Sequence, residues 1–374
     1  MRYRWLRTLH LWLSLATALP LLLLSLTGAL LVYGHELQRL LQPSAWTVEV
    51  PAPGAEPLPF ETLVARLAEQ KPEVRVWSFG LNDNPEAPWT LWLADGGGVI
   101  NLDPYSGRVV DHYRQQDSLY GIVVGLHRRW LTGSKSVTPW IRHFISAVSL
   151  VLILQMLVGL WMWLLPPKRL ARLKVDFARS PRAVVLRLHQ LSGVVTAVLL
   201  AVVAFTGMSL YWHGPIQRVV EAATGQEVAD QGNPEFGALA PIRDLDAAIA
   251  VGRAAFPDSR LKHFRMPRAG EPVMLGLKPD DALAVSRVWV GDDPPRLLAS
   301  ETGADQNAAT WFWRLRYPIH IGDFAGPVVR ALWVIVALLP AAFVVSGLWL
   351  HLDRRSRARA GRRTRRAEAA ASRA

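Results

Sequence analysis

The chain has 374 residues, of which 51% are hydrophobic and 19% are charged, and its mean hydropathy is +0.17. This balance is too apolar for an ordinary soluble domain and too charged for a chain that lies wholly in a membrane, so it predicts spanning helices together with soluble segments. The chain contains no cysteine, which excludes disulfides, iron–sulfur clusters, cysteine-ligated zinc and thiol catalysis.

The net charge of +12 is concentrated in residues 1–8, 165–188 and 351–374. These segments hold 19 of the 42 Lys and Arg residues and only three acidic residues, so the rest of the chain is net negative. Because Lys and Arg accumulate on the cytoplasmic side of membrane proteins, both termini and the central basic loop are predicted to be cytoplasmic. The arginine-rich tail would also suit nucleic acid or anionic lipid. Topology alone explains it, and we expect no nucleic-acid partner.

The first span is predicted within residues 1–35, where the apolar run from Leu9 to Tyr33 is long enough to cross about 30 Å of hydrocarbon. Arginines precede the run as they do in a signal peptide. However, the run is too long for a signal peptide and no small-residue cleavage site follows it. We therefore expect an uncleaved helix, kinked at Pro20.

The first soluble segment, residues 36–118, is predicted to be an α+β domain. Apolar residues recur at helical spacing from Phe60 to Glu69, which indicates a short amphipathic helix. Gly96 to Gly98 form a turn rather than a phosphate-binding loop, because no helix and no Lys-Ser/Thr follows them. Asp103 to Gly107 form a hairpin turn, in which Pro sets φ and Gly supplies a positive φ. The predicted strands are residues 74–81, 89–94, 99–102 and 108–111.

The chain then returns to the membrane. An interfacial helix is predicted within residues 119–139 and a second span within residues 140–165. A cytoplasmic loop, residues 166–185, leads to a third span, residues 186–213.

The second soluble segment, residues 214–308, has the same organisation as the first. Its predicted helix runs from Leu245 to Phe256, and its predicted strands are residues 263–266, 273–277 and 285–290. The chain is completed by an interfacial helix, a fourth span and a basic cytoplasmic tail, at residues 309–327, 328–351 and 352–374.

The second half of the chain repeats the first. A Leu-His pair opens the first and third spans, at His10 and His189, and a Thr-Gly pair follows each histidine 17 residues later. A Gly-Leu-Trp sequence closes the second and fourth spans. Since each half begins and ends in the cytoplasm, the halves form a parallel repeat about an axis along the membrane normal. The predicted fold class is therefore membrane α-helical plus α+β, with four spans and two outside α+β domains.

Four histidines occupy matching places in the two halves, His10 with His189 near the cytoplasmic surface and His127 with His320 near the outer surface. An ionisable residue in a span is expensive, which favours a functional role over simple solvation by lipid headgroups. Paired imidazoles in a bilayer suit axial ligation of haem iron. A haem on the axis between the halves would take one ligand from each half, and without cysteine it would be held non-covalently.

The other histidines are weaker candidates. His351 lies at the correct depth to compete for a cytoplasmic haem and remains a candidate ligand. His35 and His213 recur in both halves but lie outside the apolar runs. A copper or zinc site is less natural, because the chain has no cysteine and only six methionines. His143 is not duplicated, and His112 and His263 belong to the soluble segments and are expected at the surface.

These motifs, together with the outside segment that ends near Asp-Pro-Tyr-Ser-Gly, resemble the PepSY-associated transmembrane proteins over about residues 5–355. The closest functional analogues in that family are ferric-siderophore reductases of the bacterial inner membrane that bind two b-type haems. The resemblance implies a multi-pass inner-membrane protein with PepSY-like periplasmic domains. It also implies that His10 and His189 serve a cytoplasmic haem and that His127 and His320 serve a periplasmic haem, although the pairing itself rests on the repeat.

The implied activity is reduction of a ferric siderophore in the periplasm, which releases iron because hard oxygen chelators hold Fe³⁺ far better than Fe²⁺. No dinucleotide-binding Gly-x-Gly-x-x-Gly motif and no flavin-like domain is present, so the electron donor is expected to be a separate reductase or a membrane quinol. Alternatives are a b-type cytochrome subunit for a partner protein, a non-enzymatic sensor or regulator of a protease, and a permease. Four spans leave a permease little room for a translocation path.

Overall fold

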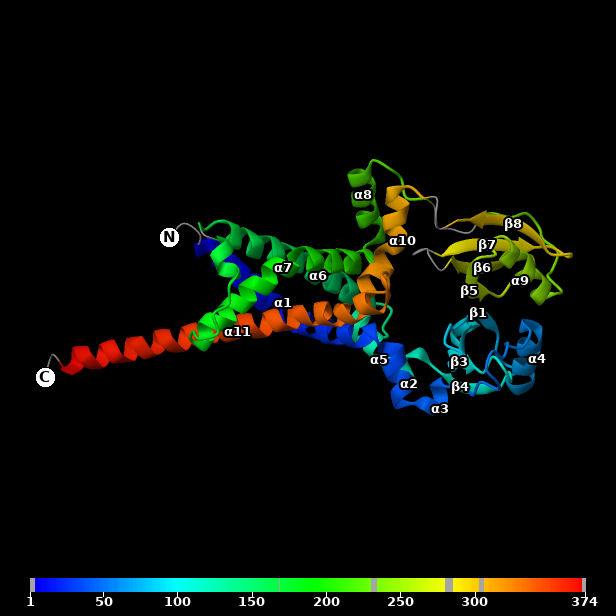
Figure 1. Ribbon diagram of the computed structural model, residues 1–374, viewed down its shortest axis with the longest axis horizontal. Coiled ribbons are helices and arrows are strands. Elements are labelled where there is room, and N and C mark those ends of the chain that lie inside the picture. The colour runs from blue at the N-terminus through cyan, green and yellow to red at the C-terminus, as the bar shows by residue number, and fades with distance from the viewer. Residues whose placement is uncertain (1–3, 168, 230–233, 280–284, 303–305, 372–374) are drawn as a thin grey trace. The chain divides into compact units, whose positions relative to one another are not determined.

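The computed structural model describes residues 4–167, 169–229, 234–279, 285–302 and 306–371. The chain divides into two compact units (Figure 1). One, which we call the helical unit, comprises Met1–Val32, Leu126–His213 and Arg316–Ala374. The other, which we call the sheet unit, comprises Tyr33–Gly125 and Gly214–Leu315.

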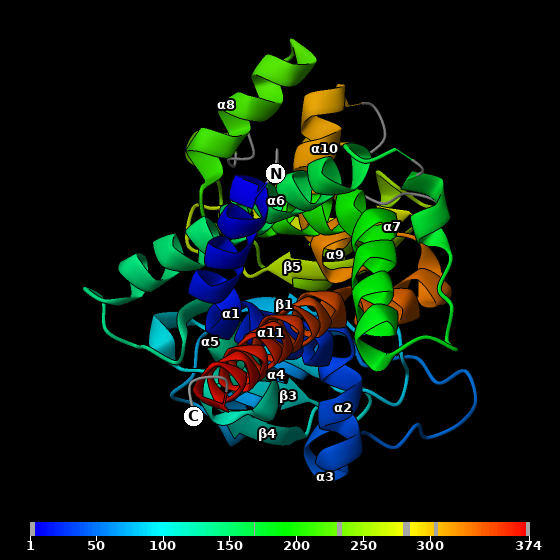
Figure 2. The same cartoon turned by 90° about the vertical axis from the view of Figure 1, so that its left-hand side faces the viewer.

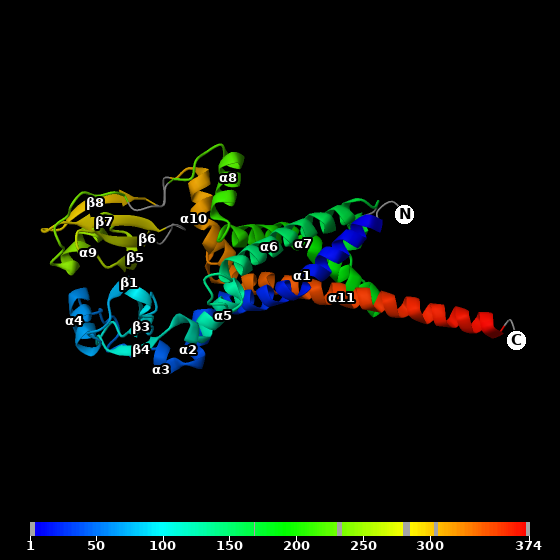
Figure 3. The same cartoon turned by 180° about the vertical axis from the view of Figure 1, so that it is seen from behind.

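Among its described residues, the helical unit contains four helices that are long and apolar enough to cross a membrane, which confirms the four predicted spans. They are α1 (Arg4–Val32), α6 (Thr138–Leu164), α7 (Pro181–Ser209) and α11 (Gly326–Ala371), whose candidate span ends at Arg362. Helix α1 packs against α6 and α11, and α7 packs against the same two helices. Helix α1 begins and α11 ends at the same end of the unit (Figures 1 and 3), and Figure 2 views the four helices from that end.

Polar side chains join these helices where the backbone is interrupted. Pro340 lies inside α11 and lacks the N–H that would continue the helical hydrogen bonding. The hydroxyl of Ser25, on α1, accepts a hydrogen bond of 3.1 Å from the backbone N–H of Ala341 and donates to the carbonyl of Ala337. Neighbouring helices commonly satisfy backbone groups freed by proline in this way. Further along α11, Asp353 forms an ion pair with Arg182 and so joins α7 to α11.

The sheet unit contains one antiparallel sheet of eight strands in the order β4-β3-β2-β1-β5-β6-β7-β8. The first soluble segment supplies β1 (Val76–Gly80), β2 (Trp89–Leu93), β3 (Val99–Leu102) and β4 (Val109–Tyr113). The second supplies β5 (Ser259–Arg265), β6 (Val273–Pro279), β7 (Ser286–Gly291) and β8 (Arg296–Glu301). Seven of these strands were predicted from the sequence. The eighth was missed, because β8 is an edge strand without a fully buried residue and so shows no alternation of apolar residues.

The two soluble segments, expected to form two α+β domains, share one sheet and one core. Strand β1 pairs with β5, and the rings of Phe79 and Phe264 stack across this junction at 4.8 Å between centroids. Helices α4 (Phe60–Gln70) and α9 (Leu245–Ala254) contribute Leu63 and Ile249 to the same core. Each four-stranded half would leave an unpaired edge, and the β1–β5 pairing removes both edges together.

Short helices connect the long elements. The α-helices are α2 (Gly34–Leu41), α3 (Pro43–Trp46), α5 (Leu119–Arg129), α8 (His213–Thr224) and α10 (Ala308–Ile321). The 3₁₀ helices are η1 (Ala94–Gly96), η2 (Gln115–Asp117) and η3 (Arg169–Leu173). Helices α5 and α10 correspond to the predicted interfacial helices, and each carries one histidine of the outer pair.

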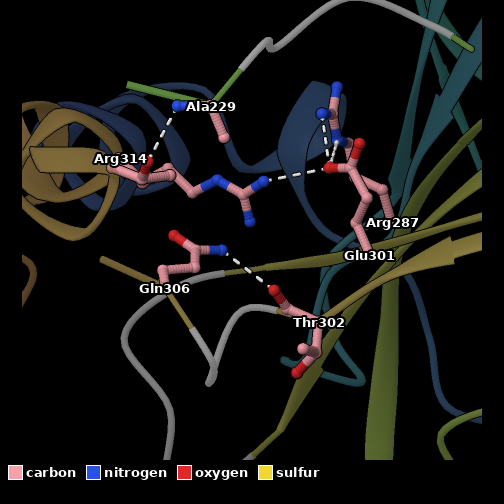
Figure 4. A network of polar contacts seen from close by, with 7 residues as sticks. Ala229, Arg287, Glu301, Thr302, Gln306 and Arg314 are labelled. Atoms are coloured by element: carbon pink, nitrogen blue, oxygen red, sulfur yellow. Dashed lines mark hydrogen bonds and ion pairs between the residues drawn. The ribbon is translucent and has the colours of Figure 1, made fainter. Parts of the chain in front are cut away.

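The ends of α5 and α10 within the sheet unit are held by buried or charged groups. The backbone N–H of Tyr120, in the first turn of α5, donates to the side-chain oxygen of the buried Gln38 at 2.8 Å. Glu301 on β8 accepts from Arg287 at 2.6 Å and from Arg314 of α10 at 3.0 Å (Figure 4). An exposed ion pair contributes little, but these two arginine side chains are largely buried, so the contact fixes α10 against β8.

The shared sheet is tested by a disulfide between its halves. Ser78 on β1 lies opposite Arg265 on β5, and directly opposed residues of antiparallel strands are close enough for a disulfide. Because the chain has no native cysteine, the variant S78C/R265C is expected to form one intramolecular disulfide after mild oxidation. Its gel mobility should change on reduction. S78C alone and S78C/R260C are the controls, and two separate sheets would leave all three variants reduced.

Candidate functional site

The structure seats each histidine of the outer pair on the Thr-Gly pair of a neighbouring spanning helix. On α5, His127 places Nδ1 2.9 Å from the hydroxyl of Thr27, and its Cε1 lies 3.3 Å from where a Cβ on Gly28 would be. On α10, His320 places Nδ1 3.4 Å from the hydroxyl of Thr206 and 3.0 Å from the carbonyl of Val203.

The two outer imidazoles also lie together. Their ring centroids are 6.2 Å apart and their planes are inclined by 51°. Burial lowers the pKa of His127 to about 3, with the nearby His320 as a further cause, and burial lowers the pKa of His320 as well. Both rings are therefore neutral at pH 7, and the neutral imidazole is the form that binds a metal.

The inner pair repeats this arrangement against the Gly-Leu-Trp sequences. In α1, His10 places Cε1 3.7 Å from where a Cβ on Gly159 of α6 would be. In α7, His189 has the same distance to Gly347 of α11. His10 therefore packs against α6, and His189 packs against α11. The two imidazoles lie close enough to interact electrostatically.

The hydroxyl groups beside the histidines decide which ring nitrogen carries the proton. A hydroxyl has a single proton, and the hydroxyls of Thr27 and Thr206 already donate theirs to backbone carbonyls of their own helices, at 2.6 and 2.9 Å. They can only accept from Nδ1–H of His127 and His320. In both rings this leaves the lone pair on Nε2, as it is in many metal-ligating histidines whose other nitrogen is hydrogen-bonded.

The inner pair follows this rule on one side only. Nδ1 of His189 lies 2.7 Å from the hydroxyl of Ser346, which donates to the carbonyl of Ala342, so Nδ1 of His189 carries the proton. Nδ1 of His10 is buried and has no hydrogen-bond partner in the described part of the chain. The cause is a sequence difference between the halves, because Val158 precedes Gly159 where Ser346 precedes Gly347.

These positions fit axial ligands of a haem. A metal–imidazole bond of about 2 Å places the centroids of two axial rings roughly 6 Å apart, close to the separation of His127 and His320. The donors are imidazoles without thiolate or carboxylate, and no group of three or more His, Cys, Asp or Glu residues that could hold a bare metal ion occurs within the described residues. The site chemistry therefore fits haem better than copper or zinc.

The fifth candidate, His351, lies on α11 one helical turn after Gly347, so it shares the face of α11 that contacts His189. Its side chain is half-buried and has no hydrogen-bond partner among the residues that the structure describes. It stays a candidate ligand without a fixed orientation.

Four of the remaining histidines contact other groups. The ring of His35 stacks on Tyr120 at 4.1 Å, and Nε2 of His112 bonds the carbonyl of Gly97 at 2.9 Å. His143 accepts a hydrogen bond of 2.9 Å from Nε1 of Trp212. His263 is not the surface residue that the sequence suggests. It packs over Gly276 of the neighbouring strand, and burial lowers its pKa.

Sequence reasoning identified the Thr-Gly and Gly-Leu-Trp repeats without recognising their use. The threonines orient the outer imidazoles, and the glycines admit all four rings at short range. Their fixed spacing from His10 and His189 was the available signal. Ser346 has no counterpart in the first half, so no repeat could have revealed it.

These features define a four-span membrane protein with two pairs of imidazoles held between helices. A family model for the PepSY-associated TM region matches residues 7–354 of the chain, and the protein belongs to that family. This result confirms the family suspected from the sequence motifs. A comparison with curated proteins finds no match to the chain.

The space between each glycine and its imidazole differs from site to site, so alanine substitutions should have different effects on stability. A Cβ on Gly207 would lie 2.7 Å from Cε1 of His320, whereas a Cβ on Gly159 would lie 3.7 Å from His10, an ordinary contact. G207A is expected to destabilise the protein by about 1–3 kcal/mol because His320 must move, and G159A should leave stability close to wild type. Thermal unfolding of the detergent-solubilised protein measures both. Equal melting temperatures for the two variants would contradict the seating of His320.

Proposed function

We propose that this protein is a haem-dependent reductase of the bacterial inner membrane that passes electrons across the bilayer to a ferric siderophore in the periplasm. The observation that carries the proposal is the outer pair. Two neutral imidazoles from different helices lie 6.2 Å apart, and their hydrogen bonds assign the proton of each ring to Nδ1. Such an arrangement leaves a lone pair on both Nε2 atoms, which are the atoms that would hold a haem iron.

Two b-type haems account for both pairs of histidines. His127 and His320 would hold the outer haem, and His10 and His189 would hold the inner haem, with His351 as a further candidate ligand. Haem iron supplies one-electron redox chemistry whose potential depends on its axial ligands and on nearby hydrogen bonds. The residues of this chain would bind and orient it. Thr27, Thr206 and Ser346 fix ring orientation, and the apolar spans exclude water.

The topology belongs to the same proposal. The matched contacts at Gly28 and Gly207, and at Gly159 and Gly347, support a parallel tandem repeat. Basic residues at the chain termini and in the central loop support a cytoplasmic location for both termini, and hence a periplasmic location for the sheet unit.

The overall reaction needs one electron for each iron. Fe³⁺ in the chelate gains the electron and becomes Fe²⁺, which the oxygen ligands of a siderophore hold far less tightly. The donor would be a membrane quinol or a separate reductase, because the chain shows no dinucleotide-binding motif. Membrane lipid and the siderophore are the other expected partners.

One measurement distinguishes the proposed reductase from two other functions. A b-type cytochrome subunit would use the same haems to serve a protein partner. A non-enzymatic sensor is favoured by a cavity of about 380 Å³ in the sheet unit, whose lining includes Trp77, Arg265 and Trp289. A cavity of this size lies within the range of small-molecule sites.

An optical spectrum of the purified protein distinguishes these functions. Two b-type haems predict a Soret band that shifts when dithionite is added and shifts back when a ferric siderophore is then added under anaerobic conditions. A Soret band that does not shift back would indicate a cytochrome subunit and contradict the reductase. Absence of any Soret band would indicate a sensor.

The ligand assignment is tested by substitution. H127A and H320A should each reduce the haem-to-protein ratio by about half, since each would remove an axial ligand of one of two haems, and H10A and H189A should do the same for the other. H112A and H143A are matched controls with other hydrogen-bond partners. The ratio is measured by pyridine haemochrome assay against protein concentration. Unchanged haem in H127A and H320A would refute the outer site.

A further inference from the structure

Three arginines gather beside the outer histidine pair. Arg128 and Arg129 end α5 directly after His127, and Arg142 lies in the second turn of α6. The loop between these helices turns back sharply, with Trp130 and Leu131 both at positive φ, and the ring of Trp130 packs on Phe144 of α6 at 5.4 Å. The end of α5 and the start of α6 are thereby brought together.

No carboxylate among the described residues forms an ion pair with Arg142. Its guanidinium lies over the ring of Tyr211, 4.1 Å from the centroid. The other groups that act on its charge, within the ranges that the structure describes, are Arg128 and Arg129. Like charges repel, and the ring of Tyr211 attracts Arg142 without neutralising its charge.

The surroundings of the cluster are aromatic and rigid. The hydroxyl of Tyr211 donates to the carbonyl of Pro139 at 3.3 Å, and Nε1–H of Trp212 donates to Nδ1 of His143 at 2.9 Å. Because Nδ1 of His143 accepts a hydrogen bond, the proton of its neutral ring lies on Nε2, which adds a donor near the arginines.

The position of the cluster is also unusual for a membrane protein. Arginine is disfavoured at the outer ends of spans, and the part of the chain outside the basic termini and central loop is net negative. Topology therefore does not explain a group of arginines at this level that forms no ion pair within the part of the chain that the structure describes. An anion that enters from outside would supply the missing negative charge.

We propose that Arg128, Arg129 and Arg142 bind the substrate of the proposed reductase, and that this substrate is an anionic ferric chelate with carboxylate or catecholate oxygens. The inference rests on the proposed function. Guanidinium groups form short, charge-assisted hydrogen bonds to such oxygens, and Tyr211 and Trp212 offer flat faces to aromatic groups of a chelate. Since Arg128 follows His127 in the chain, the bound chelate lies beside the outer histidine pair. The arginines would repel a cationic chelate, and a neutral chelate would gain no electrostatic attraction from them.

An electron-free binding experiment tests this site. Gallium(III) tricatecholate has the charge and shape of the iron complex and is not reduced, so its binding can be followed by quenching of tryptophan fluorescence. Wild-type protein in detergent should bind it saturably. R128Q/R142Q should bind it at least tenfold more weakly, and added salt should weaken wild-type binding further. The control R243Q/R296Q removes the same charge from exposed ion pairs of the sheet unit and should bind like wild type.

A second measurement separates this inference from the proposed function. Dithionite-reduced wild type and R128Q/R142Q, with equal haem content, are mixed with anionic ferric tricatecholate or with a neutral ferric trihydroxamate. The variant should lose at least tenfold in reoxidation rate with the first chelate and keep its rate with the second. Equal losses with both chelates, or none, would overturn the anion site while leaving the reductase intact. Haem that neither chelate reoxidises would refute the reductase and this inference together.

Anionic lipid is the competing occupant. Wild-type protein without saturable gallium chelate binding, together with phosphatidylglycerol that co-purifies with wild type and not with R128Q/R142Q, would assign the arginines to a headgroup and overturn the proposal.

Discussion

The structure depends on how imidazoles are accommodated among apolar helices. A polar ring between spanning helices is costly unless its nitrogens are bound, and one ring nitrogen of three of the four paired histidines has a local partner in the structure. Those partners are hydroxyls and carbonyls of the adjacent helix, which cost nothing extra because they already belong to the helix. The other nitrogen is then available to a ligand that lies between the helices.

Close approach is the second requirement, and glycine provides it. At His127 and His320, a glycine on the facing helix removes a Cβ that would crowd the imidazole, whereas at His10 and His189 a Cβ on the facing glycine would make an ordinary contact. Small residues at helix–helix contacts in membranes usually serve packing between backbones. Here they admit a ring, so the same small residue serves packing and site formation together.

The two pairs are not equivalent. The outer histidines are carried by short helices, α5 and α10, which continue into the sheet unit and are fixed there by Gln38 and by Glu301. The inner histidines belong to the spans themselves, and His10 lacks the hydroxyl partner that Ser346 gives His189. A hydrogen bond to one nitrogen of an imidazole raises the basicity of the other nitrogen, so Ser346 gives His189 a property that His10 lacks.

The sequence by itself determined the four spans, seven of the eight strands and the family, because hydrophobic length, period-two alternation and recurring motifs are local properties of the chain. Only the tertiary structure decided that β1 joins β5 in one sheet and that Thr27 and Thr206 orient His127 and His320. Each of these contacts joins residues far apart in the sequence. Its partner is selected by how helices and strand edges pack in space, and no local pattern records that choice.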